Sequence, residues 1–191
     1  MDAIVVYESV FGNTRAIAEA IAEGLEATAV LPVHEAPEHP LETADLLVVG
    51  GPTHMHGLAT ARSRRLAVAT AHEEDGTHVE PGATEEPGLR RWLRDLSPEI
   101  APHAASFDTR LDQSPWMTGV AARAIARRLR RLGIDVIATE SFLVEDTEGP
   151  LESGELERAR AWGVKLARRL ALPTEALVHA GGGRGASTWF G

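Results

Sequence analysis

The chain has no cysteine, a single lysine, few aromatic residues and no long apolar run. Without cysteine there are no disulfides, thiolate metal sites, iron–sulfur clusters or cysteine nucleophiles. No apolar stretch approaches the about 20 residues that a membrane span needs. The first residues, Met1 to Ile4, lack the basic start and apolar stretch of a signal peptide. We therefore expect a cytoplasmic protein with no membrane association.

Positive charge is also scarce, since 19 basic residues face 28 acidic ones and the net charge is −9. Non-specific nucleic-acid binding requires a basic face, so we expect no nucleic-acid partner. Basic residues do cluster at Arg123, Arg127, Arg128, Arg130 and Arg131. This cluster is either a solvated helix face or a docking patch.

A length of 191 residues predicts one domain. Residues 3–7 and 46–50 are short, continuous apolar runs, typical of strands buried on both faces of a parallel sheet. We predict strands at 3–7, 27–33, 46–50, 104–109 and 134–142, and helices at 14–25, 119–132 and 155–170. Strands that alternate with helices favour an α/β fold whose parallel sheet is covered on both faces.

Two stretches differ from this domain of residues 1–171. Residues 71–87 hold six acidic residues, two prolines and no Lys or Arg. They predict a surface insertion, which is either a solvated loop or a lid or partner-docking loop. Residues 172–191 are glycine-rich and predict a flexible C-terminal tail, in which Trp189 and Phe190 could dock on a partner subunit.

The segment from Tyr7 to Arg15 joins the end of a buried strand to the start of a helix. A helix N-terminus presents unpaired N–H groups and a partial positive charge. Ser9 and Thr14 add hydroxyl groups, and Gly12 lets the backbone approach an anion closely. The segment suits a phosphate group, although an ordinary βα turn has the same spacing. It is not a Walker loop, because the Gly-Lys-Ser/Thr ending is absent.

This segment resembles the FMN phosphate-binding loop of the flavodoxin family. Tyr7, Ser9, Gly12 and Thr14 fit the family pattern, whereas Val10 stands where a polar residue is more common. The resemblance extends over about residues 2–171. It implies a doubly wound five-stranded parallel sheet of order 2-1-3-4-5 and FMN as the cofactor. The residues that it assigns to the phosphate are Ser9, Phe11, Gly12, Asn13 and Thr14.

Two further loops follow strands of the predicted sheet. Ligands of doubly wound sheets bind beyond the carboxyl ends of the strands, where the strand order switches. The resemblance places one side of the flavin ring against Pro52, Thr53, His54 and Gly57. It places the other side against Asp108, Thr109, Arg110 and Trp116.

Several of these side chains have alternative interpretations. His54 and His56 either line the flavin, lie at the surface without a role, or bind a metal; we predict no metal, because a third ligand is lacking. Trp116 either stacks on the ring or packs against its own loop. Trp92 and Trp162 lie in helical patterns and are expected in the core.

The resemblance implies electron transfer through FMN, with a redox partner protein or NAD(P)H on the other side of the reaction. An NAD(P)H-dependent FMN quinone reductase is the alternative, as is an FMN-free interaction module of the same fold. Positive charge from His54, His56 or Arg110 would stabilise an anionic reduced flavin. The oligomeric state does not follow from the sequence.

Overall fold

The computed structural model describes residues 2–38, 41–54, 57–71, 77–98, 100–113 and 119–171. The predicted tail 172–191, Trp116, His56 and residues 72–76 of the predicted insertion lie outside these residues. Within the described part, no helix combines the length and the apolar character needed to traverse a lipid bilayer.

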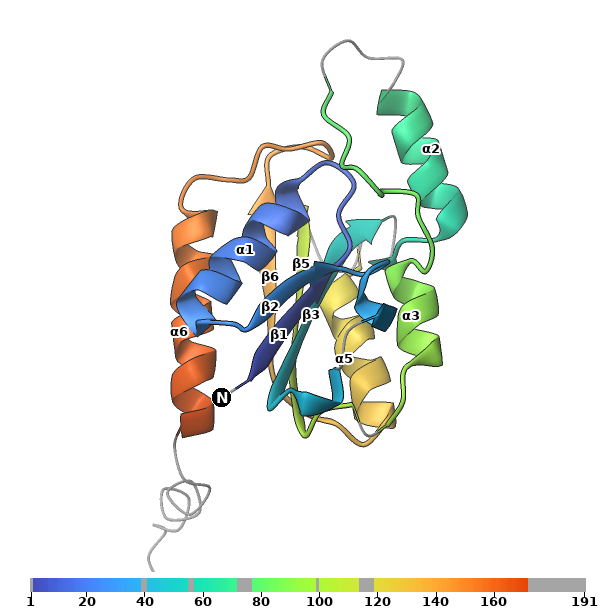
Figure 1. Ribbon diagram of the computed structural model, residues 1–191. Coiled ribbons are helices and arrows are strands. Elements are labelled where there is room, and N and C mark those ends of the chain that lie inside the picture. Colours follow the sequence, from blue (N-terminus) through green and yellow to red (C-terminus); the bar gives the residue numbers. More distant parts are fainter. Residues whose placement is uncertain are drawn as a thin grey trace, which may run out of the picture.

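Five parallel strands form the centre of the molecule in the order β2-β1-β3-β5-β6 (Figure 1). Their bounds are Ala29–Pro32, Ala3–Tyr7, Leu46–His54, His103–Leu111 and Asp135–Val144, in that order. A two-residue strand, β4 (Gly57–Leu58), pairs antiparallel with the end of β3. Counting only the parallel strands, this order confirms the predicted 2-1-3-4-5 arrangement.

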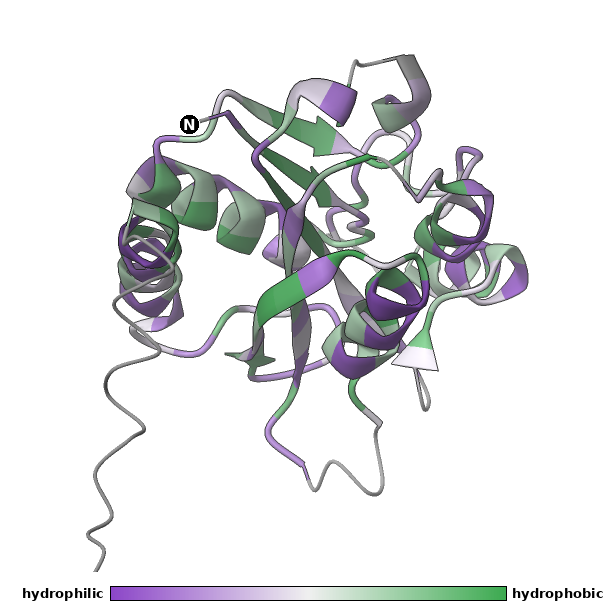
Figure 2. Ribbon diagram, turned by 90° about the horizontal axis from the view of Figure 1, so that it is seen from below, coloured by the Kyte–Doolittle hydropathy of each residue, from purple (hydrophilic) through white to green (hydrophobic). Residues whose placement is uncertain are grey.

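Helices cover both faces of the sheet. Two of them, α1 (Asn13–Leu25) and α6 (Glu155–Ala171), pack on one face, and α3 (Leu89–Asp95) and α5 (Ala121–Arg131) pack on the other. Successive residues of a strand point to opposite faces. Val5 therefore packs with α1 and α6, whereas Ile4 and Val6 pack with α3 and α5. Figure 2 shows the hydrophobic strands between these two helix layers.

The long connection between β3 and β5 holds structure that the sequence pattern did not predict. It contains α2 (Ala61–Ala71) and α3, and two short 3₁₀ turns, Ala36–Glu38 and Leu41–Thr43, precede β3. In α2 only Arg64 and Ala71 are buried, so the helix lacks the apolar stripe that reveals a helix in sequence. It projects beyond the sheet (Figure 1). Trp92 on α3 and Trp162 on α6 are 5% and 7% exposed, which confirms their predicted place in the core.

The basic cluster on α5 divides between two surroundings. Arg128 donates hydrogen bonds to the carbonyl oxygens of Leu93 and Arg94 at 3.0 and 2.9 Å, which ties α5 to α3. The other four arginines of the cluster are exposed, as expected for a solvated helix face: Arg123, Arg127, Arg130 and Arg131.

Two glycines let α1 and α6 pack backbone to backbone. A Cβ atom placed on Gly163 of α6 would lie 2.2 Å from the carbonyl oxygen of Ile21 on α1. A Cβ atom placed on Gly24 of α1 would lie 2.0 Å from the carbonyl oxygen of Arg160. The α6 helix ends at Ala171. This residue lines a surface hollow together with Asp45 and His103, near the amino ends of β3 and β5.

We expect Gly163→Ala to lower the free energy of unfolding. The added methyl group would press on helix backbone that cannot rotate away, an overpacking cost of roughly 1–3 kcal/mol, which opposes a gain in helix propensity of about 1 kcal/mol. Urea unfolding measures the net loss. Arg168→Ala on the exposed side of α6 is the control and should change stability by no more than about 0.5 kcal/mol. A Gly163→Ala variant as stable as the parent would show that the two helices have room to separate.

Candidate functional site

The predicted site residues meet at the carboxyl edge of the sheet, where the loops after β1, β3 and β5 converge. A narrow cavity of about 70 Å³ lies between these loops. Its lining includes nine of the predicted residues: Ser9, Phe11, Asn13, Thr14, Pro52, Thr53, His54, Thr109 and Arg110. The fold therefore brings together segments that lie about 100 residues apart in the sequence. Gly12, Gly57 and Asp108 are not part of this lining.

The N-terminus of α1 opens onto this edge without a side-chain cap. Gly12, its N-cap residue, has a left-handed backbone with φ of 90°, and the first turn contains no acidic residue. The N–H groups of a first helical turn have no partner within the helix, and they carry partial positive charge. Ser9 Oγ accepts a hydrogen bond from the Gly12 N–H at 3.1 Å, which shapes the loop before the helix. This geometry suits an oxyanion such as phosphate.

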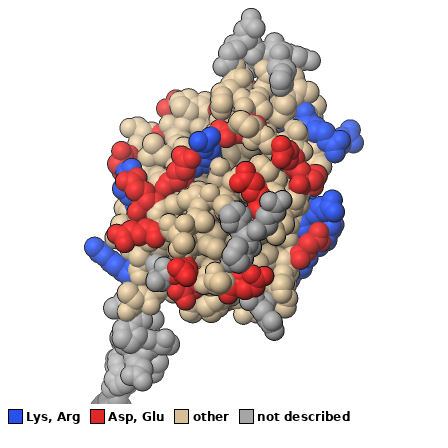
Figure 3. Space-filling model, in the orientation of Figure 1, with Lys and Arg blue, Asp and Glu red and all other residues tan. Residues whose placement is uncertain are grey.

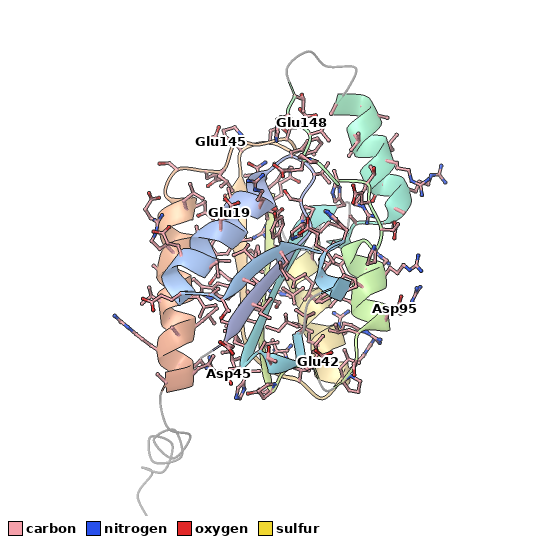
Figure 4. All side chains as sticks on the ribbon, in the orientation of Figure 1. Glu19, Glu42, Asp45, Asp95, Glu145 and Glu148 are labelled. Carbon is pink, nitrogen blue, oxygen red and sulfur yellow. The ribbon has the colours of Figure 1, made fainter. Side chains whose placement is uncertain are left out.

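Hydrogen bonds hold the start of α1 against two other loops. The Thr14 and Thr109 hydroxyl oxygens lie 2.7 Å apart, and both side chains are buried. Asn13 Nδ2 donates to the carbonyl oxygen of Glu148 at 3.0 Å. Glu148 belongs to the loop after β6, at the same edge of the sheet (Figure 4). The sequence did not indicate that this loop takes part in the site.

Asp108 is fully buried and forms hydrogen bonds at the start of α5. Its Oδ2 accepts hydrogen bonds from the Thr53 hydroxyl at 2.7 Å and from the Ala122 N–H at 3.1 Å. Thr53 Oγ1 in turn accepts from the Ala121 N–H at 2.9 Å. The two side chains thus cap the N-terminus of α5. The contact of Asp108 with a flavin ring stays a prediction, and capping is the contact that the structure shows.

His54 and Arg110 bring unsatisfied polar atoms to the narrow cavity. His54 Nε2 and Arg110 Nε are buried and have no hydrogen-bond partner within the described residues. A ligand between the loops could satisfy both atoms. Arg110 is held from its other end, where Nη1 donates to the carbonyl oxygens of Leu111 and Gln113 at 3.0 and 2.8 Å.

The charge at the cavity comes from Arg110 and not from His54. Burial, followed by repulsion from Arg64, lowers the pKa of His54 below its ordinary value. A lowered pKa favours the neutral imidazole near pH 7, which leaves Arg110 as the charged group of the two. His56 lies outside the described residues, within which no three His, Asp or Glu side chains are grouped as metal ligands.

An ion pair that the sequence did not predict lies directly behind the site. Glu8, the residue after β1, pairs with Arg64 of α2 at 2.8 Å, and the two side chains are 4% and 2% exposed. Glu8 Oε2 also accepts the Leu89 N–H at the start of α3 at 2.8 Å. Burial raises the pKa of Glu8, whereas the charge of Arg64 lowers it. The second Nη atom of Arg64 pairs with Glu86 at 2.8 Å.

Part of the predicted insertion 71–87 lies against the loop after β1. We call residues 77–83 the strap. Within it, the Glu80 N–H donates to the carbonyl oxygen of Val10 at 2.8 Å. The Glu80 side chain is 10% exposed and pairs with Arg15 at 3.2 Å. These contacts differ from those of a solvated loop, which was one of the two sequence-based interpretations.

A larger cavity of about 780 Å³ opens on the other side of the strap, between α1 and the ends of β1 and β2. Its lining contains six carboxylates, from Glu8, Glu19, Glu35, Glu80, Glu85 and Glu86, but only two arginines, Arg15 and Arg64. Acidic side chains gather on this face of the molecule (Figure 3). The surplus of negative charge disfavours a phosphate there. The N–H groups at the α1 N-terminus, with their partial positive charge, are more favourable for an anion than this acidic lining.

A family model for the flavodoxin domain matches residues 4–64, a range that includes the loops after β1 and β3. Solved structures match over nearly the whole domain. An archaeal flavodoxin is 21% identical with a TM-score of 0.55, and the match covers 90% of this chain and 100% of that one. The fold is flavodoxin-like.

Two further structures support this assignment of the fold. Oxidised flavodoxin 1 from Bacillus cereus is 16% identical with a TM-score of 0.55, over 88% of this chain and 98% of that one. The Trp repressor binding protein from Bacillus subtilis is 13% identical with a TM-score of 0.52, over 88% and 99% of the two chains. No curated protein matches the sequence. At these identities the likeness establishes the fold of the flavodoxin-like chain.

We expect Arg64→Met to lower the free energy of unfolding by roughly 3–5 kcal/mol, because it leaves the Glu8 carboxylate buried without its charge partner. Chemical denaturation measures the loss. Arg62→Met, at an exposed position of the same helix, is the matched control. Combining Glu8→Gln with Arg64→Met should recover part of the loss, since neither charge is then buried alone. A loss below about 1 kcal/mol in Arg64→Met would contradict the structural importance of this pair.

Proposed function

We propose that the protein binds FMN non-covalently and transfers electrons through it. The observation that carries the proposal is the uncapped N-terminus of α1, set at the sheet edge between the loops after β3 and β5. This is the switch point at which doubly wound sheets bind their ligands. When bound, FMN supplies the redox chemistry, and the protein supplies position and electrostatics.

The residues of the narrow cavity fit the two ends of FMN. From the lining, we assign Ser9, Phe11, Asn13 and Thr14 to the phosphate, and Pro52, Thr53, His54, Thr109 and Arg110 to the ring. Gly12 and Gly57, which lie outside the lining, are assigned to the phosphate and the ring, respectively. The unsatisfied atoms of His54 and Arg110 match the hydrogen-bonding atoms on the edge of the ring. Small-molecule pockets commonly measure roughly 300–1,000 Å³. The loops must therefore separate before a flavin ring can enter this narrower space.

Absorbance spectroscopy and calorimetry with added FMN, riboflavin and FAD test the proposal. The phosphate site predicts that FMN binds more tightly than riboflavin, which has no phosphate. It also predicts that FAD does not bind tightly, because the sequence offers no second nucleotide-binding motif. A protein that takes up none of the three flavins would support the FMN-free interaction module instead. The name of one structural neighbour, the Trp repressor binding protein from Bacillus subtilis, is the reason to keep this interaction module as an alternative.

We expect Thr14→Ala to weaken FMN binding by about 1–3 kcal/mol, the usual cost of an unsatisfied buried polar partner. Thr14 lies in the first turn of α1, and its hydroxyl bonds to Thr109 at the cavity. Thr139→Ala is a matched control, because its hydroxyl also pairs across neighbouring segments, with Ser106 at 3.1 Å, but away from the cavity lining. Equal FMN affinity in the parent and Thr14→Ala would remove Thr14 from the phosphate site.

Stopped-flow reduction separates the electron carrier from the NAD(P)H-dependent quinone reductase. Arg110 places a positive charge at the cavity, which would stabilise an anionic reduced flavin and so favours two-electron chemistry. Rapid reduction of the FMN-loaded protein by NADH or NADPH supports the reductase. Reduction only by a protein donor supports the carrier.

A further inference from the structure

The strap places the carboxylate of Glu80 beside Gly12, in the loop to which the phosphate is assigned. We propose that Glu80 is a built-in competitor of the phosphate, so that FMN binds at the α1 N-terminus only by displacing the strap. The proposal rests on the proposed function and adds regulation of the same site. It concerns residues 77–83, all of which the structure describes.

Contacts on the loop after β1 position this carboxylate. A Cβ atom placed on Gly12 would lie 3.1 Å from Glu80 Oε1 and 3.8 Å from His78 Cδ2, so the strap covers the N-cap of α1. Oε2 of the same carboxylate pairs with Arg15, in the first turn of the helix. The backbone bond from Glu80 to Val10 holds the segment in register with the loop. Glu80 thus supplies the negative charge that an uncapped helix N-terminus favours.

The strap has few contacts that oppose its release. Apart from the Glu80 contacts, the Thr77 hydroxyl donates to Glu148 Oε2 at 2.7 Å, and Gly82 lies against the His34 ring. Ala83 is its only buried hydrophobic residue. Little apolar surface is exposed when such a segment moves, so the cost of displacement is small.

A phosphate can replace Glu80 because it brings more charge to the same groups. A phosphate monoester carries about 1.5–2 negative charges at pH 7, whereas a carboxylate carries one. Arg15 loses its contact with Glu80 when the strap leaves, and its guanidinium can then pair with the phosphate. Riboflavin has no phosphate, so it has no anionic group that could replace the Glu80 carboxylate. The strap therefore makes binding depend on a dianionic end group.

Isosteric substitution of the strap carboxylate tests the competition. We expect Glu80→Gln to tighten FMN binding roughly tenfold, which corresponds to about 1.4 kcal/mol for a charge at a helix N-terminus. Riboflavin affinity should not change. Glu85→Gln is the matched control, because it removes one charge from the same acidic stretch while its side chain is 63% exposed and faces His34. FMN affinity in Glu85→Gln should stay within about twofold of the parent.

Hydrogen exchange of the parent protein provides a second measurement. FMN should increase amide exchange in residues 77–83, although ligands usually slow exchange near their sites. Riboflavin should leave exchange in the strap unchanged. Protection of the strap by FMN, or equal FMN affinity in the parent and Glu80→Gln, would overturn the competition.

Inorganic phosphate separates this inference from the proposed function. If the amide signals of residues 12–15 shift with phosphate in Glu80→Gln at lower concentrations than in the parent, while no flavin binds, the competition stands and the proposed FMN function fails. If FMN binds equally to both proteins, the function stands and the competition fails. If neither phosphate nor FMN binds to Glu80→Gln, both fail.

Discussion

A single buried carboxylate, that of Glu8, determines how the long connection between β3 and β5 is attached to the sheet. It accepts the Arg64 guanidinium from α2 and the Leu89 N–H from α3. Arg64 then reaches Glu86, just beyond the strap. Because α2 buries almost no apolar surface, this network substitutes for the hydrophobic stripe that normally docks a helix. The strap itself is held beside the α1 N-terminus by the contacts of Glu80 with Val10 and Arg15.

Charge, more than cavity size, determines what the carboxyl edge of the sheet can hold. The larger cavity is lined mainly by carboxylates, whereas the narrow one adjoins an uncapped helix and contains Arg110. In the present arrangement Glu80 already neutralises part of the positive potential of that helix. In the proposed competition, the site is balanced between Glu80 and an external anion. Such a balance makes affinity sensitive to a single charge.

The sequence predicted the elements whose signal is local. Continuous apolar runs revealed β1 and β3, and the resemblance of the first loop to flavodoxins supplied the strand order. The helix α2 escaped prediction because an ion pair between residues 56 positions apart holds it. The capping role of Asp108 and the contact of Glu80 with Gly12 also depend on long-range packing, which no spacing of residues encodes. Nine of the predicted site residues line the narrow cavity, Gly12, Gly57 and Asp108 do not, and Trp116 lies outside the described residues.

The close packing of α6 on α1 has a practical consequence for experiments on this protein. It brings Ala171 to the amino edge of the sheet, next to Asp45 and His103, at the pole of the domain opposite the candidate site. A dye or a surface linker attached to Ala171→Cys, an exposed position in a chain that has no other cysteine, would point away from the strap. Immobilised protein would then present the α1 N-terminus to solution, so that single-molecule fluorescence could follow the strap while flavin exchanges.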